Sequence, residues 1–190
     1  MLPQASQHAK HNKEQGRWKE AEVKGLQIRK RIEKDKNEII HLLNQAANEL
    51  ARVSGVQFPP GTRQLADSYG FDGLVALQDG KVVGTVAYRV RSRRMHIFDF
   101  VVHASCRGKG VGNQLLAELE KIGAESRVRS LSLQTLEESG AISAFENMGF
   151  KKQSAKPEFL FATPGKRALT TVYMVKRLAE KRTQQPGRWW

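Results

Sequence analysis

The sequence has 190 residues, of which 39% are hydrophobic and 27% are charged, a balance typical of one globular domain. No apolar run approaches the ~20 residues that a membrane helix requires, so we expect no membrane span. The single cysteine, Cys106, excludes an intrachain disulfide and a cysteine-based zinc site, and we expect no metal. The formal net charge of +13 indicates a polyanionic binding partner, such as nucleic acid, an acidic membrane face or a phosphorylated cofactor.

Both ends of the chain differ from its middle. Residues 1–22 are polar and predict a flexible or helical extension outside the core. The first six residues lack the charged-then-apolar order of a secretory signal, so we expect a cytoplasmic protein. Residues 179–190 form a basic tail ending in Trp189 and Trp190, whose rings can stack on bases. We expect the folded domain to span residues 23–178.

The domain begins with a short strand and a helix. Apolar residues over 26–32 predict a strand, although the basic residues between them leave a helix open. Asp35 and Glu38 have the spacing of a capping box. Apolar residues then recur at helical spacing, which predicts a helix over 36–52, and the cluster of two prolines and a glycine at 58–61 ends it.

A meander of three strands follows. The dipeptide Asp79-Gly80 favours a tight hairpin between strands over 73–78 and 81–91, and residues 92–94 turn into a third strand over 95–103. After a glycine-rich loop, an amphipathic helix carries four apolar residues on one face: Val111, Leu115, Leu119 and Ile122. The remaining predicted elements are a strand over 129–135, a helix over 139–148, a strand from 150 and a strand over 169–178.

The loop between the third strand and this helix is suited to a pyrophosphate. Its sequence is Arg107-Gly108-Lys109-Gly110-Val111-Gly112. A helix N-terminus presents unpaired N–H groups and a partial positive charge. The three glycines let the backbone approach a phosphate closely, and Arg107 and Lys109 add charge.

Two other phosphate-binding loops do not match. A Walker A loop needs Gly-Lys followed by Ser or Thr, whereas Lys109 precedes Gly110. A dinucleotide fingerprint needs G-x-G-x-x-G after a parallel unit, whereas this loop reads G-x-G-x-G after meandering strands.

Three segments together resemble the GNAT superfamily of N-acetyltransferases. Residues 100–116 are similar to its acetyl-CoA loop, whose pattern R/Q-x-x-G-x-G/A is met by Arg107, Gly110 and Gly112. Residues 141–150 are similar to its A-I-x-x-Y-E-K-x-G-F helix, and residues 172–176 to its closing strand. The order of predicted elements from about 23 to 178 also matches the family.

The resemblance implies an α+β fold with a mixed, mostly antiparallel sheet of six to seven strands flanked by helices. That sheet is expected to splay between the strands at 95–103 and 129–135 and to admit acetyl-CoA there. The loop amides would hold the pyrophosphate, and the backbone of Val101, Val102 and His103 would pair with the pantetheine amides. The implied activity is transfer of an acetyl group from acetyl-CoA to an amine of a small molecule or a protein.

Attack by an amine requires its neutral form, whereas a lysine-like amine with a pKa of ~10.4 is protonated at pH 7. We predict His96 as the general base, six residues before Val102, and Asp99 as the second candidate. The amide of Val101 or Val102 would stabilise the thioester oxygen. Simple alternation places His96 with Phe98, Phe100 and Val102 on one face, and a β-bulge would exchange the faces.

The sequence departs from the family pattern at Phe145, which lies in the expected cofactor site. Many members have a tyrosine there that protonates the leaving thiolate, and phenylalanine has no such proton. Either the thiolate leaves unaided, as a thiol pKa of ~8.5 permits, or another group such as Tyr173 assists. Glu138 also replaces the asparagine that is usual near the start of this helix.

Two further functions stay open. One is an acetyltransferase that docks on nucleic acid or a ribonucleoprotein through its basic surface. The other is a catalytically silent fold that binds acyl-CoA. The acceptor wall is expected from residues 36–52, 58–72 and 156–169, whose charges select no particular amine. The sequence also leaves a homodimer open, and we expect no membrane partner.

Overall fold

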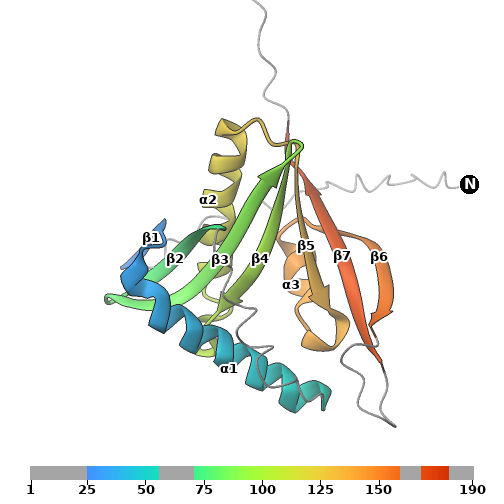
Figure 1. Ribbon diagram of the computed structural model, residues 1–190, viewed down its shortest axis with the longest axis horizontal. Helices are drawn as coiled ribbons and strands as arrows, with labels where there is room; N and C mark the ends of the chain where they lie inside the picture. Colours follow the sequence, from blue (N-terminus) through green and yellow to red (C-terminus); the bar gives the residue numbers. More distant parts are fainter. Residues whose placement is uncertain (1–24, 56–70, 159–167, 180–190) are drawn as a thin grey trace, which may run out of the picture.

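The computed structural model describes residues 25–55, 71–158 and 168–179, which form a seven-stranded sheet with helices on both faces (Figure 1). The predicted extension at 1–22, nearly all of the basic tail, and much of the predicted acceptor wall at 58–72 and 156–169 lie outside these residues. None of the helices described has the length and apolar character that crossing a bilayer demands.

The strands run in the spatial order β1-β2-β3-β4-β5-β7-β6. Every neighbouring pair is antiparallel except β4 and β5, which are parallel. The predicted mixed, mostly antiparallel α+β fold is therefore confirmed. The strands are β1 Leu26–Lys30, β2 Asp72–Gln78, β3 Lys81–Arg91, β4 Arg94–Val102, β5 Ser130–Leu136, β6 Lys151–Glu158 and β7 Leu169–Arg177.

The meander of β2, β3 and β4 is closed by two tight turns. Asp79 and Gly80 have φ angles of 51° and 76°, and Ser92 and Arg93 have φ angles of 49° and 60°. Turns with two positive φ angles match the twist of the strands they join. Both predicted hairpins are confirmed.

Helices cover the two faces unequally (Figure 1). The long helix α1 (Lys36–Ser54) crosses one face over β2, β3 and β4, and the helices α2 (Val111–Glu125) and α3 (Ile142–Asn147) lie on the other. The larger core lies under α2 and α3 and includes Leu115 and Leu119, both fully buried. A smaller core under α1 joins its apolar side to β2. Short 3-10 turns, η1 (Glu33–Asp35), η3 (Ala104–Cys106) and η4 (Glu137–Ser139), precede the three helices.

The predicted capping box at the start of α1 is wrong. The Asp35 carboxylate accepts hydrogen bonds from the Arg29 guanidinium at 2.6 and 2.8 Å and from the Ile32 N–H at 2.9 Å. Glu38 instead accepts from the N–H of Val82 on β3. The Arg29 hydrogen bonds hold the pKa of Asp35 below its ordinary value. Both carboxylates are therefore engaged by hydrogen bonds outside α1 and do not cap the helix.

A β-bulge interrupts β4 at Asp99, whose φ is 48°. Phe98 pairs with Ala87 and Val101 with Thr85, so two residues of β4 oppose one residue of β3. Beyond the bulge the side chains change faces. Phe100 and Val102 pack against the α2-side core, and Val101 packs against the α1-side core. The simple alternation predicted for this strand is therefore wrong after Asp99.

Candidate functional site

The groove at the centre of the sheet begins where β4 and β5 stop pairing. Their parallel register runs from Arg94 and Ser130 to Ile97 and Leu133. Farther along, the two strands separate, as Figure 1 shows at the lower half of the sheet. A groove of about 590 Å³ opens there, bounded by β4, the end of β5, α1, α3 and the glycine loop. The splay lies where the sequence placed it.

The predicted phosphate-binding loop leads from η3 directly into α2. Gly108 and Gly110 adopt positive φ angles of 72° and 88°, which other residues resist. The first intrahelical hydrogen bond joins the Gln114 N–H to the Gly110 carbonyl at 3.1 Å. The amides of residues 111–113 therefore have no intrahelical acceptor, and no acidic residue lies in this first turn. These features are the ones that favour an anion at a helix N-terminus.

Gly112 lies on the wall of the groove and has a separate steric reason to be glycine. A Cβ atom there would lie 2.8 Å from Cε of Met148 and 3.6 Å from Cε1 of Phe100. All three residues line the groove. A side chain at position 112 would therefore displace Met148 and narrow the space in which an elongated ligand would lie.

At the end of β4, the backbone of one residue, Val102, faces this groove. The His103 N–H donates to the Val83 carbonyl at 2.9 Å, so it is already used in pairing with β3. Because successive residues of a strand point their N–H and C=O groups to opposite sides, Val102 faces away from β3. Consistently, its carbonyl accepts a hydrogen bond from Nε of Arg107 at 3.0 Å. The Val102 amide is thus the best placed of the backbone groups predicted to bind the pantetheine arm.

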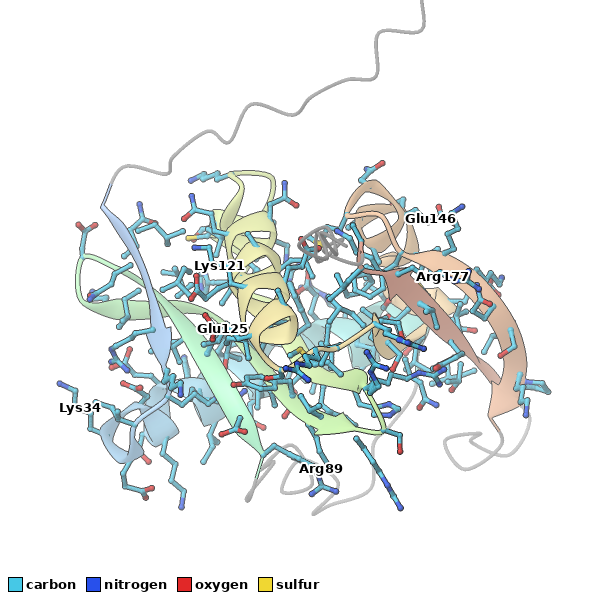
Figure 2. All side chains as sticks on the ribbon, turned by 90° about the horizontal axis from the view of Figure 1, so that it is seen from above. Lys34, Arg89, Lys121, Glu125, Glu146 and Arg177 are labelled. Carbon is cyan, nitrogen blue, oxygen red and sulfur yellow. The ribbon has the colours of Figure 1, made fainter. Side chains whose placement is uncertain are left out.

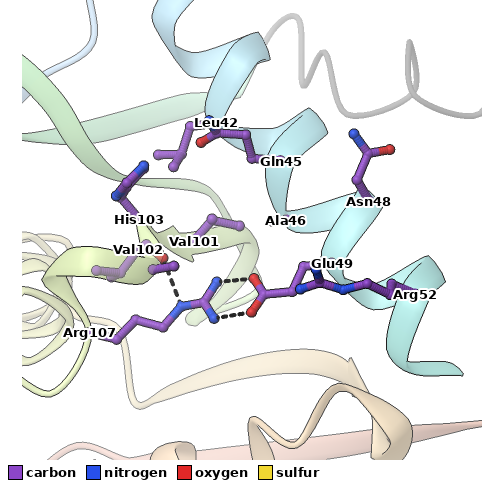
Figure 3. Close-up of a pocket in the computed structure, with 11 residues that line it drawn as sticks. Leu42, Gln45, Ala46, Asn48, Glu49, Arg52, Val101, Val102, His103 and Arg107 are labelled. Atoms are coloured by element: carbon purple, nitrogen blue, oxygen red, sulfur yellow. Dashed lines mark hydrogen bonds and ion pairs between the residues drawn. The ribbon is translucent and has the colours of Figure 1, made fainter.

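Arg107 ties the glycine loop to α1. Its guanidinium donates two hydrogen bonds to the Glu49 carboxylate, at 2.8 and 2.7 Å (Figure 3). This contact raises the pKa of Arg107 and lowers the pKa of Glu49 from their ordinary values. The charge that the sequence assigned to the phosphate is therefore balanced by a carboxylate. Glu49 was missed because it lies 58 positions from Arg107, outside any local motif.

The same ion pair borders a second cavity, of about 460 Å³, between α1 and the end of β4. Gln45, Asn48 and Arg52 of α1 line one side of it, and His103 lines the other (Figure 3). Glu49 and Arg107 belong to the walls of both cavities. The bridge thus lies between the central groove and a second pocket under α1.

Phe145 forms an apolar wall of the central groove. Its ring packs edge-on against Phe100 and Phe150, with centroids 5.7 and 5.9 Å apart, and only 8% of the residue is exposed. Tyr173, predicted as an alternative proton donor, does not line the groove. Its hydroxyl accepts a hydrogen bond from Nη1 of Arg94 at 3.1 Å. The structure therefore does not bring Tyr173 and Phe145 together.

The two predicted bases occupy different places. Asp99 lies in the bulge and lines the groove. His96 lies one residue before the groove begins, half-buried, with Nδ1 3.1 Å from Oγ of Ser132 on β5. Burial and the charges of Arg94 and Arg91 lower the pKa of His96, which favours the neutral ring. Ser132, 1% exposed, carried no recognisable signal in the sequence.

A splayed mixed sheet with a glycine-rich helix start beside the opening is the arrangement that the resemblance implies for enzymes that bind a coenzyme A thioester. Sequence comparison agrees. The model of the acetyltransferase (GNAT) family matches residues 39–150, more than half of the chain, so the protein belongs to that family. No curated protein matches the chain significantly.

Solved structures share the fold. The ribosomal-protein-alanine N-acetyltransferase from Brucella melitensis is 25% identical, with a TM-score of 0.59 over 80% of this chain and 99% of its own. The ribosomal-protein-S18-alanine N-acetyltransferase from Escherichia coli is 18% identical, with a TM-score of 0.62 over 83% and 97%. A putative streptothricin acetyltransferase from Bacillus anthracis, solved with acetyl coenzyme A, is 19% identical, with a TM-score of 0.50 over 60% and 65%. The protein is an acetyl-CoA-dependent N-acetyltransferase, which transfers an acetyl group to an amine.

Proposed function

We propose that the central groove holds the pantetheine arm and acetyl group of acetyl-CoA and that the glycine loop holds its diphosphate. The observation that carries this proposal is the continuity of the two: Gly108 and Gly112 line the groove, and the unpaired amides at the α2 N-terminus lie at its end. Acetyl-CoA supplies an activated thioester. The chain supplies the amide of Val102, which faces the groove and can donate to the thioester oxygen.

His96 is the proposed general base. Its neutral state leaves one ring nitrogen able to accept a proton, and if Nδ1–H donates to Ser132, that nitrogen is Nε2. Its position, one residue before the groove, suits proton transfer through a water molecule. Asp99 stays the second candidate, because it lines the groove directly. No tyrosine is proposed as an acid, since the wall at position 145 is apolar and a thiolate is a good leaving group.

The proposed acceptor is an amine of a protein, entering from the side of α1. The pocket under α1 shares the Glu49–Arg107 bridge with the groove and can hold a peptide segment beside it. The Brucella melitensis enzyme, whose printed name specifies a ribosomal-protein alanine, supports a protein amine over a small molecule.

Three measurements test these assignments. Calorimetry with CoA should show binding, which Gly110→Ala weakens. A thiol-release assay should show turnover of acetyl-CoA with N-terminal peptides above that with small amines. Absence of CoA binding would overturn the groove assignment, whereas turnover with small amines alone would overturn only the protein acceptor.

The cellular location and the oligomeric state of the protein remain predictions. We propose a cytoplasmic enzyme, since acetyl-CoA is available there and the lone Cys106 does not form a disulfide within the chain. Light scattering on the purified chain decides whether it forms the homodimer that the sequence left open.

A further inference from the structure

Arginines gather at the end of the sheet that lies opposite the glycine loop. They come from the β3–β4 hairpin, the loop before β5 and the end of β7, and the side chains of all of them are exposed. We call this set the arginine end: Arg89, Arg91, Arg93, Arg94, Arg127, Arg129 and Arg177.

Backbone pairing holds the three segments side by side. The Arg129 N–H donates to the Arg93 carbonyl at 2.8 Å. Ser130 pairs with Arg94 on one side and with Arg177 on the other. With neighbouring strands ~4.8 Å apart, the distance from β3 to β7 is on the order of 15 Å, enough to meet several phosphates of one strand.

Much of this surface lies on the sheet face opposite α2 and α3. Side chains alternate between faces, and the neighbours Tyr88 and Met95 point into the α2-side core, so Arg89 and Arg94 point the other way. Figure 2 shows Arg89 on the side of the molecule away from α2, which carries Lys121. The helix α1 crosses this face nearer the other end of the strands (Figure 1).

Carboxylates are scarce in the segments that form this end. Residues 89–94, 126–130 and 175–179 contain no Asp or Glu. Within the described part of the chain, no carboxylate pairs with Arg91, Arg94 or Arg177. Arg91 stands directly opposite Arg94 on the neighbouring strand, and like charges so placed destabilise an antiparallel pair. An external anion would offset this repulsion.

The chemistry of the surface favours a nucleic acid over other anions. Arginine binds phosphates through a planar, two-pronged fork and also stacks on aromatic rings. At this end the large exposed apolar residues among those described are Val90 and Phe98, too few for a membrane anchor or the apolar centre of a protein interface. Phe98 is 41% exposed and stacks on Phe71, over which Arg89 lies at 4.1 Å, a platform for an unpaired base.

We propose that the arginine end is a docking surface for single-stranded RNA, held through its phosphates and through base stacking near Phe98. The seven arginines of this surface lie outside the lining of the central groove, whereas Phe98 belongs to it, so the RNA surface adjoins the proposed acetyl-CoA site. It would hold an RNA-associated protein substrate beside the groove.

The test is fluorescence anisotropy with a labelled, mixed-sequence RNA of about 20 nucleotides at several salt concentrations. The variant Arg91→Gln/Arg93→Gln/Arg94→Gln is compared with Lys30→Gln/Lys34→Gln/Lys81→Gln, which removes three exposed positive charges from β1, η1 and the start of β3. We expect the arginine variant to bind RNA at least tenfold more weakly and to lower the salt slope by about 2, while the lysine variant changes affinity less than threefold. If the first variant does not fold, Arg127→Gln/Arg177→Gln tests the same surface from the other two segments.

Each other result counts against the proposal. Equal losses of RNA affinity in the two variants would show a general charge effect. Absence of RNA binding by the parent protein at 100 mM salt would refute the docking surface. Tighter binding to a DNA duplex, to anionic lipid vesicles or to a polyglutamate peptide than to RNA would replace RNA as the partner. CoA affinity serves as the internal control, since it should be the same in all variants.

Discussion

The two regions proposed to bind anions lie at opposite ends of β4 and are built differently. At one end, a contiguous glycine-rich loop leads into α2, whose first amides have no intrahelical acceptor. At the other end, side chains from three distant segments meet through strand pairing. The first is a site of fixed geometry, where one added Cβ matters. The second is a distributed surface, where each charge contributes a small and salt-dependent part of the binding energy.

The difference explains how each region appears in the sequence. A site made of backbone groups needs residues that permit a conformation, and these are contiguous and recognisable. A surface made of side chains needs only their charge, which looks like ordinary solvated arginine until the pairing is known. Variants that affect one region and spare the other are therefore the sharpest tests of the distinction.

The largest effect is expected for His96→Ala, which removes the proposed base located between the two regions. We expect kcat to fall about 10²- to 10³-fold with little change in CoA affinity, because a base acts on the reacting amine and not on the cofactor. Steady-state thiol release measures both quantities. Asp99→Asn is the matched variant, and a loss confined to that variant would assign the base to Asp99.

Gly110→Ala should disrupt the backbone site. A Cβ at a φ of 88° is strained by about 1–2 kcal/mol, and a free loop that relaxes to relieve the strain must regain it on binding. We therefore expect the Kd for CoA to rise about tenfold while RNA affinity stays unchanged. Gly25→Ala is the control, since Gly25 has a φ of 80° with nothing within 4 Å of an added Cβ and lies far from the loop in sequence. Unchanged CoA affinity in the first variant would contradict the assignment of the loop.

Glu49→Gln tests how the loop charge is balanced. The substitution removes a carboxylate from beside the proposed phosphate site and releases Arg107. We expect CoA affinity to rise about threefold at low salt and the difference to vanish at high salt. The melting temperature should fall slightly, because a half-exposed ion pair contributes at most about 1 kcal/mol. A lower CoA affinity would instead show that Glu49 positions Arg107 for binding.

The smallest expected effect is electrostatic: charges of the arginine end change the pKa of His96. Burial, Arg94 and Arg91 hold the pKa of His96 below its ordinary value, so activity should decline only as the pH falls below ~6.5. Arg94→Gln removes one of the causes that oppose protonation. The pKa should then rise, and the acidic limb of the kcat profile should move to higher pH. An unmoved limb would separate His96 from the titrating group.

Much of the fold could be read from local patterns. The two hairpins follow from Asp79-Gly80 and from residues 92–94, and α2 follows from its apolar face. The conformation of the glycine loop could also be predicted, because it depends on the backbone freedom of consecutive residues. The family match over residues 39–150 rests on the same contiguous stretches.

Tertiary structure decided what depends on distant partners. The bulge at Asp99 changed which face Phe100 occupies, and Arg29 took the Asp35 carboxylate from the helix end. Glu49 reached Arg107 across 58 positions, and strand pairing assembled the arginine end. The sequence by itself determined the local conformations, since those are governed by steric and hydrogen-bonding preferences of neighbouring residues. Only the folded chain decided the charge balance and the pairing of side chains, because both depend on distances that no local pattern specifies.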